Sequence, residues 1–268
     1  MKQRVSRKYK QQQRVIKHAQ FQRDQNLLKH QVKSKAHLTS PMAPKVHAAT
    51  PTLPPQIIFE DQHLVVVNKP AGLLTQEDVS GDSTLEQWLR KHFGREYVGT
   101  IHRLDRNTSG IMIFAKRTKA ASRLSESLRE NKIQRTYLAW LHGEIRTPQK
   151  WTHWLLKDEA KNHVKVVSER THDSKVAILN LKPIRYALLK GVKLTLAEIE
   201  LETGRSHQIR VQCAAKGFPI AGDPKYGKDN DQLFPRPALH SFRVSFPHPM
   251  SGEIVSYVCP LPPDLDKA

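Results

Sequence analysis

Residues Ile101–Gly110 read I-H-R-L-D-R-N-T-S-G and stand directly before the apolar run Ile111–Phe114. The one carboxylate in this stretch, Asp105, lies between Arg103 and Arg106. Two flanking arginines favour an ionised carboxylate, which suits a nucleophile or an ion-pair anchor better than a general acid. Taken alone, an aspartate among hydroxyl and small residues is more often a turn or capping residue. The rest of the chain has to decide between these two interpretations.

The charge of the chain is high and unevenly distributed. The 268 residues have a formal net charge of +19, and residues 1–55 contribute 12 Lys or Arg against one acid, Asp24. A basic body behind a more basic arm favours a polyanionic partner, most simply nucleic acid. Solubility alone explains the pattern less well, because negative charge serves solubility at least equally.

The composition also excludes several classes of protein. Two cysteines, Cys213 and Cys259, are too few for a disulfide framework or a Cys-rich zinc site, and they favour a reducing compartment. No apolar run approaches the roughly 20 residues of a membrane span, and the N-terminus lacks the apolar core of a secretory leader. The N-terminus is basic like a mitochondrial presequence, but it is rich in Gln and Lys rather than Arg and Ser. We therefore expect a cytoplasmic protein of bacterial type.

The first 55 residues differ in composition from the remainder. Residues 1–35 are mostly Lys, Arg, Gln and His without a helical apolar stripe, and residues 36–55 contain five prolines. We expect residues 1–55 to form a disordered or partly helical arm, ordered by its partner, and a proline-rich linker. Residues 56–268 are expected to form a single domain.

The pattern of this domain predicts an α+β fold, a mainly antiparallel sheet with a few packed helices. Capping and apolar periodicity predict helices at Ser83–His92, with a capping box of Ser83 and Glu86, at Thr118–Glu130 and at Ser206–Lys216. The alternation along Val192–Leu201 slips by one residue, which suggests a bulge. Further strands are expected at Ile57–Glu60, Leu64–Asn68, Ile111–Lys116 and Arg135–His142, within 150–182, and in a hairpin of Ala238–Phe246 with Ile254–Val258.

Four ordered motifs resemble those of the RluA-type RNA pseudouridine synthases. The first is K-P-A-G at Lys69–Gly72, the second is H-R-L-D with T-S-G within Ile101–Gly110, and the third is R-T-Y at Arg135–Tyr137. The fourth runs from L-E-T-G-R-S-H-Q-I-R-V at Leu201–Val211 to G-F-P-I-A-G-D-P-K-Y-G at Gly217–Gly227. Four motifs in order are more specific than any short pattern alone. The small S4-type domain of many relatives is not evident in residues 1–55.

The resemblance implies a role for each matched residue. Asp105 matches the catalytic nucleophile, Tyr137 the aromatic residue that stacks on the target base, and Arg205 the arginine that pairs with the nucleophile. Arg103 matches the arginine that enters the RNA stack in place of the flipped base. Ile209 falls where the family lines the pocket with an apolar residue. Arg106, beside the nucleophile, is also expected to contact RNA.

The reaction implied by the resemblance requires no cofactor. Converting uridine to pseudouridine breaks the N1–C1′ bond and joins C5 to C1′, without a redox step or an energy source. The sequence has no G-x-G-x-x-G fingerprint, no phosphate-binding loop with Gly-Lys-Ser/Thr and no H-E-x-x-H helix. The 14 histidines show no ligand spacing beside carboxylates, so we expect no metal. The expected partner is structured RNA, ribosomal or transfer, and the expected state is a monomer.

Several other residues are interpreted as structural. His102 and His207 are expected to make structural hydrogen bonds, and Trp140, Trp151 and Trp154 to pack in the core or on the surface. Two positions depart from the family pattern. Gln212 stands where His is common and is expected to affect local packing. Arg135 replaces Lys and keeps its charge.

Two other functions remain open from the sequence. The first is a non-catalytic RNA-binding or ribosome-assembly factor on the same scaffold, against which the intact set of Asp, Tyr and Arg argues. The second is a nucleoside hydrolase that uses the same carboxylate and yields free uracil. We rank the isomerase above both.

The basic arm generates a first prediction. Deleting residues 1–50 weakens RNA binding and flattens its dependence on salt, because the arm supplies most of the net charge and phosphate contacts release counterions. Titrating RNA against the full and truncated chains over a range of KCl concentrations measures both effects. Equal affinities and equal salt slopes would refute the role of the arm.

Overall fold

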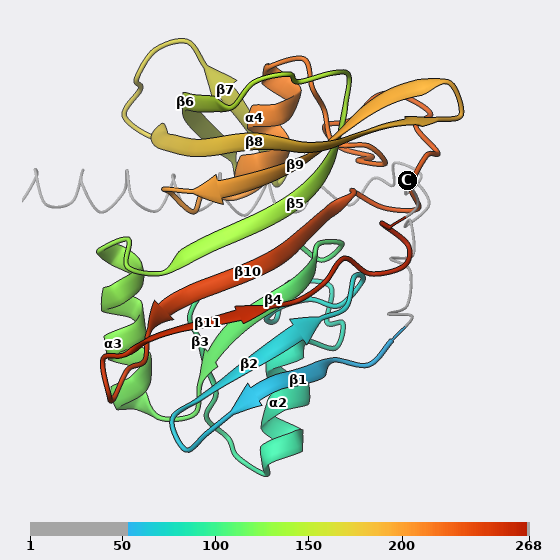
Figure 1. The fold of residues 1–268 in the computed structure, drawn as a ribbon. Helices are drawn as coiled ribbons and strands as arrows, with labels where there is room; N and C mark the ends of the chain where they lie inside the picture. The colour runs from blue at the N-terminus through green and yellow to red at the C-terminus, as the bar shows by residue number, and fades with distance from the viewer. Residues whose placement is uncertain (1–52, 267–268) are drawn as a thin grey trace, which may run out of the picture. The chain divides into compact units, whose positions relative to one another are not determined.

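The structure, a computed structural model, describes residues 53–266. Residues 1–52 of the predicted arm and linker lie outside the described residues. Figure 1 shows the elements in chain order. The described elements are β1 (Gln56–Glu60), β2 (Leu64–Lys69), α2 (Leu85–Phe93), β3 (Gly99–Thr100), β4 (Ser109–Ala115), α3 (Thr118–Arg129), β5 (Gln134–His142), β6 (Gln149–Asp158), β7 (His163–Val167), β8 (Lys175–Leu189), β9 (Val192–Leu201), α4 (Gln208–Ala215), β10 (Leu239–Pro247) and β11 (Ile254–Val258).

All eleven described strands join one sheet. Nine of them run in the order β1-β2-β4-β10-β5-β9-β8-β6-β7, while β11 pairs with β10 and β3 pairs with β4. The neighbours are antiparallel except β4 and β10, which run parallel. The predicted α+β class and the predicted hairpin, now β10 with β11, are therefore confirmed. Over residues 53–266, no helix is long and apolar enough to cross a membrane.

The two adjacent strands β2 and β4 are buried on both faces, which explains their continuous apolar sequences. Alternate residues enter two different clusters. Val65, Val67, Met112 and Phe114 pack with Leu85 and Leu89 of α2. Their neighbours in the strands pack with Ala120 and Leu124 of α3. The stretch that contains Asp105 thus leads directly into a strand that is buried on both faces.

Two predicted helix starts are wrong by one or two residues. The capping box of α2 is formed by Thr84 and Gln87, not by Ser83 and Glu86, because Thr84 is the residue with extended backbone angles before the first helical turn. Helix α4 begins at Gln208 after His207, whose φ of 51° is left-handed, and no side chain caps it. The helix predicted from Ser206 therefore starts later, because the backbone at His207 is not helical.

The predicted bulge lies in the partner strand. The pairing of β9 with β5 is regular, whereas β8 has a register shift between Pro183 and Arg185. Proline cannot donate a ladder hydrogen bond and is tolerated at bulges and sheet edges. Strand β8 is such an edge at Pro183, since its pairing with β6 ends at Leu181.

Gly110 closes the junction between β4 and β10. Its φ is 113°, and a Cβ atom there would lie 2.2 Å from the carbonyl oxygen of Ser241 in β10. Only glycine permits this backbone and this approach. The T-S-G motif therefore ends in glycine because the parallel strand passes directly above it.

The second prediction concerns this junction. Replacing Gly110 with Ala lowers the free energy of unfolding by roughly 3 kcal/mol or more, because backbone strain and a steric overlap add together. Gly191→Ala is the matched control, since Gly191 also has a positive φ of 78° but no atom lies within 4 Å of the place that its Cβ would take. Urea denaturation of both variants measures the difference. Equal losses would contradict the steric role of Gly110.

Candidate active site

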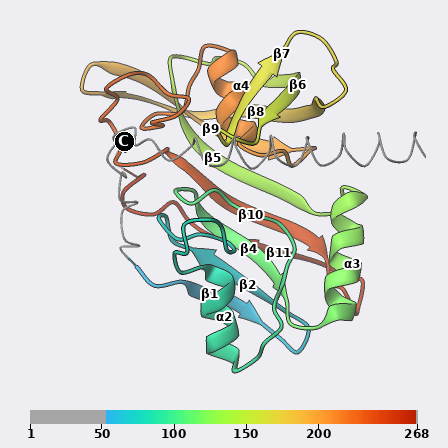
Figure 2. The same cartoon turned by 180° about the vertical axis from the view of Figure 1, so that it is seen from behind.

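The predicted nucleophile lies in the wall of an open pocket. The pocket forms where the Asp105 loop meets β5, the end of β9 and the start of α4. Helices α2 and α4 lie on the face of the sheet that is turned toward the viewer in Figure 2. The lining residues are Arg103, Leu104, Asp105, Thr108, Tyr137, Leu201, Arg205, His207, Gln208, Ile209, Arg210 and Leu239.

Asp105 is held by an arginine that is itself held by a second carboxylate. Arg210 Nη1 donates to Asp105 Oδ2 at 2.9 Å. The Nε and Nη2 atoms of Arg210 donate to the two carboxylate oxygens of Asp223, both at 2.7 Å. Arg210 and Asp223 are buried, whereas the Asp105 side chain is 29% exposed. One guanidinium thus joins a buried carboxylate to the pocket carboxylate.

The ion pair assigned to Arg205 from the sequence is wrong. Arg205 lines the pocket, but its Nε donates to the carbonyl of Val176 at 3.0 Å. Arg210 makes the ion pair with Asp105 instead. Both arginines belong to the same motif, and the left-handed turn at His207 directs the second one toward Asp105. Sequence spacing alone could not separate them.

Burial and charge fix the protonation of this network. Burial alone would raise the pKa of Asp223, but the hydrogen bonds and charge of Arg210 outweigh it and lower that pKa. Burial likewise opposes ionisation of Arg210, and the two carboxylates reverse this and raise its pKa. Both groups therefore stay charged at neutral pH.

The backbone around Asp105 is fixed by side chains from distant segments. Thr75 Oγ1 donates to the carbonyl of Leu104 at 3.0 Å and accepts its N–H at 3.2 Å. On the other side of Asp105, Arg236 Nη1 donates to the carbonyl of Asn107 at 3.2 Å. These contacts position the loop before any substrate binds.

The K-P-A-G motif, Lys69–Gly72, also fixes the backbone of the Asp105 loop. Lys69 is fully buried, and its Nζ donates to the carbonyls of Pro70, Leu73 and Arg106 at 2.8 to 3.0 Å. The N–H of Gly72 donates to the same Arg106 carbonyl at 2.9 Å. Burial lowers the pKa of Lys69 to about 7, although the charge of Asp105 opposes the shift. This motif therefore holds the Asp105 loop through the carbonyl of Arg106.

Tyr137 and Ile209 lie in the pocket as the sequence predicted. Tyr137 is 5% and Ile209 is 4% exposed, and both line the cavity. Burial raises the pKa of Tyr137, so its phenol stays neutral. Together they form an apolar wall beside the carboxylate, suited to a flat base.

The two arginines that flank Asp105 have different surroundings. Arg103 lines the pocket, whereas Arg106 makes an ion pair with Asp82 at 2.6 Å and donates to Ser80 Oγ at 3.0 Å. The structure therefore does not bring Arg106 into the pocket, because the loop around Ser80 binds its guanidinium.

His207 and Tyr226 are site residues that sequence reasoning undervalued. His207 Nε2 lies 4.0 Å from Asp105 Oδ1, and its Nδ1 is 2.8 Å from the Tyr226 hydroxyl. Burial lowers the pKa of His207, partly countered by Asp105, so the ring is neutral at pH 7. The Tyr226 ring also lies 5.1 Å from the guanidinium carbon of Arg210. The G-D-P-K-Y-G motif contained the signal, since it supplies both Asp223 and Tyr226.

The residues interpreted as structural are placed accordingly. Burial lowers the pKa of His102 to about 3, and its Nε2 accepts the N–H of Ile113 at 3.2 Å. Trp140 and Trp151 are in the core. Gln212 is buried and donates to the carbonyls of two neighbouring strands. Across residues 53–266, no group of three His, Cys, Asp or Glu residues is arranged to hold a metal ion.

Comparison with known proteins matches this architecture to one family. The RNA pseudouridylate synthase family matches residues 63–215. An uncharacterized RNA pseudouridine synthase of Bacillus subtilis is 35% identical over 222 residues, which cover 78% of this chain and 69% of that protein. The ribosomal large subunit pseudouridine synthase D of Nitrosomonas europaea is 34% identical, with coverage of 80% and 64%. The solved structure of human RNA pseudouridylate synthase domain containing 1 superposes with a TM-score of 0.67 at 26% identity, covering 84% of this chain and 89% of that one.

The third prediction tests the buried carboxylate. Asp223→Asn lowers the free energy of unfolding at neutral pH by about 3–5 kcal/mol, because Arg210 loses its buried partner. The pKa of Asp223 is lower in the folded state than in the unfolded state. Its contribution is therefore complete above the unfolded pKa of about 3.9 and is lost as the pH falls through the folded value.

Urea denaturation of both proteins between pH 2 and pH 8 measures this contribution. The difference between the wild-type chain and Asp223→Asn should be constant above about pH 5 and shrink below about pH 3.9. Glu86→Gln, which removes a surface ion pair with Arg90, is the control and costs less than about 1 kcal/mol. A difference that grows on acidification would contradict the assignment.

Proposed function

Because the chain belongs to the RNA pseudouridylate synthase family, we propose that it isomerises a specific uridine of structured RNA to pseudouridine with Asp105 as nucleophile. The observation that supports this most is the convergence of Asp105, Tyr137 and Arg210 on one pocket. These side chains come from a loop, a strand and a helix that lie far apart in the sequence. The family motifs therefore meet at one place.

The chemistry assigns a task to the carboxylate. The N1–C1′ bond of uridine breaks, the base turns, C5 bonds to C1′, and the proton on C5 leaves. An ionised carboxylate serves this either by bonding to C1′ or by removing a sugar proton to give a glycal. Arg210 binds Oδ2 of Asp105, so the other oxygen is the one available to the sugar. Both routes need the Asp105 carboxylate beside the sugar of the target nucleotide.

The pocket also requires the uridine to leave the RNA stack. The glycosidic bond is inaccessible in a stacked helix, so the base flips at a cost of a few kcal/mol. Stacking on Tyr137 returns about 1–3 kcal/mol. Arg103 and Ile209 line the pocket, which supports a role for Arg103 in filling the stack where the base was and for Ile209 in the apolar wall.

The proposal extends to the RNA substrate, the oligomeric state and the cellular compartment. The relative from Nitrosomonas europaea is named for the large ribosomal subunit, which favours ribosomal RNA over transfer RNA as the substrate. We also propose that the enzyme works as a monomer, because Asp105, Tyr137 and Arg210 come together within a single chain. The free cysteines Cys213 and Cys259 are compatible with a reducing cytoplasm.

The fourth prediction tests the nucleophile. Asp105→Asn lowers the rate of pseudouridine formation at least about a thousandfold, because the amide cannot act as a nucleophile or a base. RNA binding persists, since most of it comes from phosphate contacts. Chromatography of nucleosides from treated large-subunit ribosomal RNA and transfer RNA measures the product, and filter binding measures the affinity.

Asp173→Asn is the matched control, because Asp173 is a highly exposed loop residue whose ion pair is with His172. It should react at the wild-type rate. Pseudouridine formation by Asp105→Asn at the normal rate would show that another residue is the nucleophile. Free uracil and abasic RNA from the wild-type chain would instead identify a hydrolase.

A further inference from the structure

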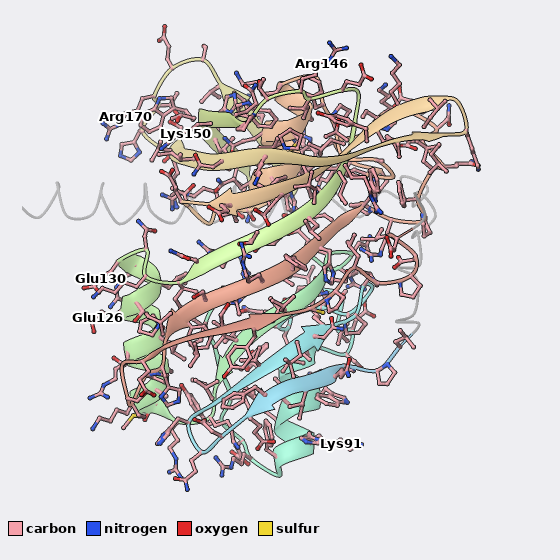
Figure 3. All side chains as sticks on the ribbon, in the orientation of Figure 1. Lys91, Glu126, Glu130, Arg146, Lys150 and Arg170 are labelled. Carbon is pink, nitrogen blue, oxygen red and sulfur yellow. The ribbon has the colours of Figure 1, made fainter. Side chains whose placement is uncertain are left out.

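Arg135 in β5 is a buried arginine without a protein partner in the described part of the chain. It is 8% exposed, and its Nε is sealed from solvent without a hydrogen-bond acceptor. Among the residues from 53 to 266, no carboxylate or carbonyl binds its guanidinium. Exposed cations such as Lys91 and Arg146, by contrast, project into solvent (Figure 3). Burying an unpaired charge is unfavourable, so such a residue indicates a missing anion.

Two other buried arginines near the site, unlike Arg135, bind carboxylates. Arg210 binds Asp105 and Asp223, and Arg236 binds Asp264 at 2.7 Å. Both are about as buried as Arg135. The fold therefore supplies carboxylates to buried arginines that have structural tasks, and it supplies none to Arg135 among the described residues.

Arg135 is not a lining residue of the pocket, but it is close to two residues that are, Tyr137 and Arg205. It precedes Tyr137 by two residues in β5, so the two side chains share one face of the sheet. A Cβ atom on Gly204 would lie 2.7 Å from Arg135 Nη1, so the guanidinium rests against the backbone of that glycine. Gly204 directly precedes Arg205, which lines the pocket.

The nearby His102 does not neutralise Arg135. Its Nε2 accepts the N–H of Ile113, so in the neutral ring Nδ1 carries the proton and is a donor. The pKa of His102 is lowered first by burial and then by the charge of Arg135, which keeps the ring neutral. Neither ring nitrogen therefore offers a lone pair to the guanidinium.

Two further arginines add positive charge to the pocket. Arg103 and Arg205 both line the pocket, and neither forms an ion pair with a residue between 53 and 266. The pocket carboxylate, Asp105, is already bound by Arg210. An anion between Arg135 and Arg205 would therefore meet guanidinium groups whose charge no described carboxylate compensates.

We propose that Arg135, with Arg205 beside it, forms a seat for a backbone phosphodiester of the RNA next to the flipped uridine. This rests on the proposed function. A guanidinium matches phosphate through parallel N–H donors, and RNA supplies a phosphate on each side of the target nucleotide. Gly204 is needed in the seat because a side chain there would displace the guanidinium. The seat compensates the buried charge only when RNA is bound.

The proposal predicts opposite effects on stability and on binding. Arg135→Gln removes no hydrogen bond or ion pair of the described residues, so its melting temperature is equal to or higher than that of the wild-type chain. The KM for RNA rises about tenfold, because a charge-assisted contact is lost. The slope of log affinity against log salt decreases by about 0.7–0.9, the amount expected for one phosphate contact. A residue that only supported the fold would lower the melting temperature and leave the salt slope unchanged.

The experiment uses the full chain with transcribed large-subunit ribosomal RNA or transfer RNA, whichever the wild-type chain modifies. Gly204→Ala is the second variant, because it keeps Arg135 and displaces only its flexible end. The control is Arg243→Gln. Arg243 pairs in register with Thr136, on the opposite face of the sheet from Arg135, and it lies 3.8 Å from Glu198 and Glu200.

The expected result is a raised KM and a smaller salt slope for Arg135→Gln and Gly204→Ala, with wild-type values for Arg243→Gln. Wild-type KM and slope in both test variants would overturn the seat. If Arg135→Gln does not fold, Gly204→Ala decides alone. If the wild-type chain forms no pseudouridine in either RNA, the proposed function fails, and that result is distinct from a failure of the seat.

Discussion

The site depends on one arginine that binds two carboxylates. Arg210 is held by two short hydrogen bonds to buried Asp223, so its remaining nitrogen has a single direction, toward Asp105. Asp223 compensates the buried guanidinium without help from a substrate, so Arg210 is already paired before RNA binds. The Tyr226 ring packs against the guanidinium and binds His207, so the other side of the carboxylate is fixed as well. The Asp105 carboxylate is therefore held between Arg210, which binds Oδ2, and His207, which lies 4.0 Å from Oδ1.

The backbone around Asp105 is fixed just as firmly as its side chain. Lys69, Thr75 and Arg236 bind carbonyl groups of the loop from three separate segments. The loop then enters β4 at Gly110, where the close approach of β10 excludes any side chain. Preorganisation of this kind is how a fold lowers the cost of placing a reactive group. The sequence motifs are thus parts of one support for a single carboxylate.

Much of this could be predicted from the sequence. Apolar alternation located most strands, since burial imposes that pattern. The predicted capping box of α2 was one residue too early, at Ser83 instead of Thr84. Pairing across space was harder. Arg205 and Arg210 belong to one motif, but a left-handed turn at His207 separates them, and no spacing rule reports that turn. Arg135 looked like a simple replacement of Lys, because a sequence shows a charge but not whether the fold supplies its partner.

In the proposed mechanism, the pocket exposes one ionised carboxylate to a flipped nucleotide, with Tyr137 as its wall and arginines at its edge. The central claim is that the uracil base is detached from C1′ and rejoined through C5. Tritium release from RNA labelled at C5 of uridine reports this directly, because only bonding at C5 expels that atom. We expect the wild-type chain to release one tritium for each pseudouridine formed, without free uracil. Retention of all tritium, or release of free uracil, would contradict the mechanism.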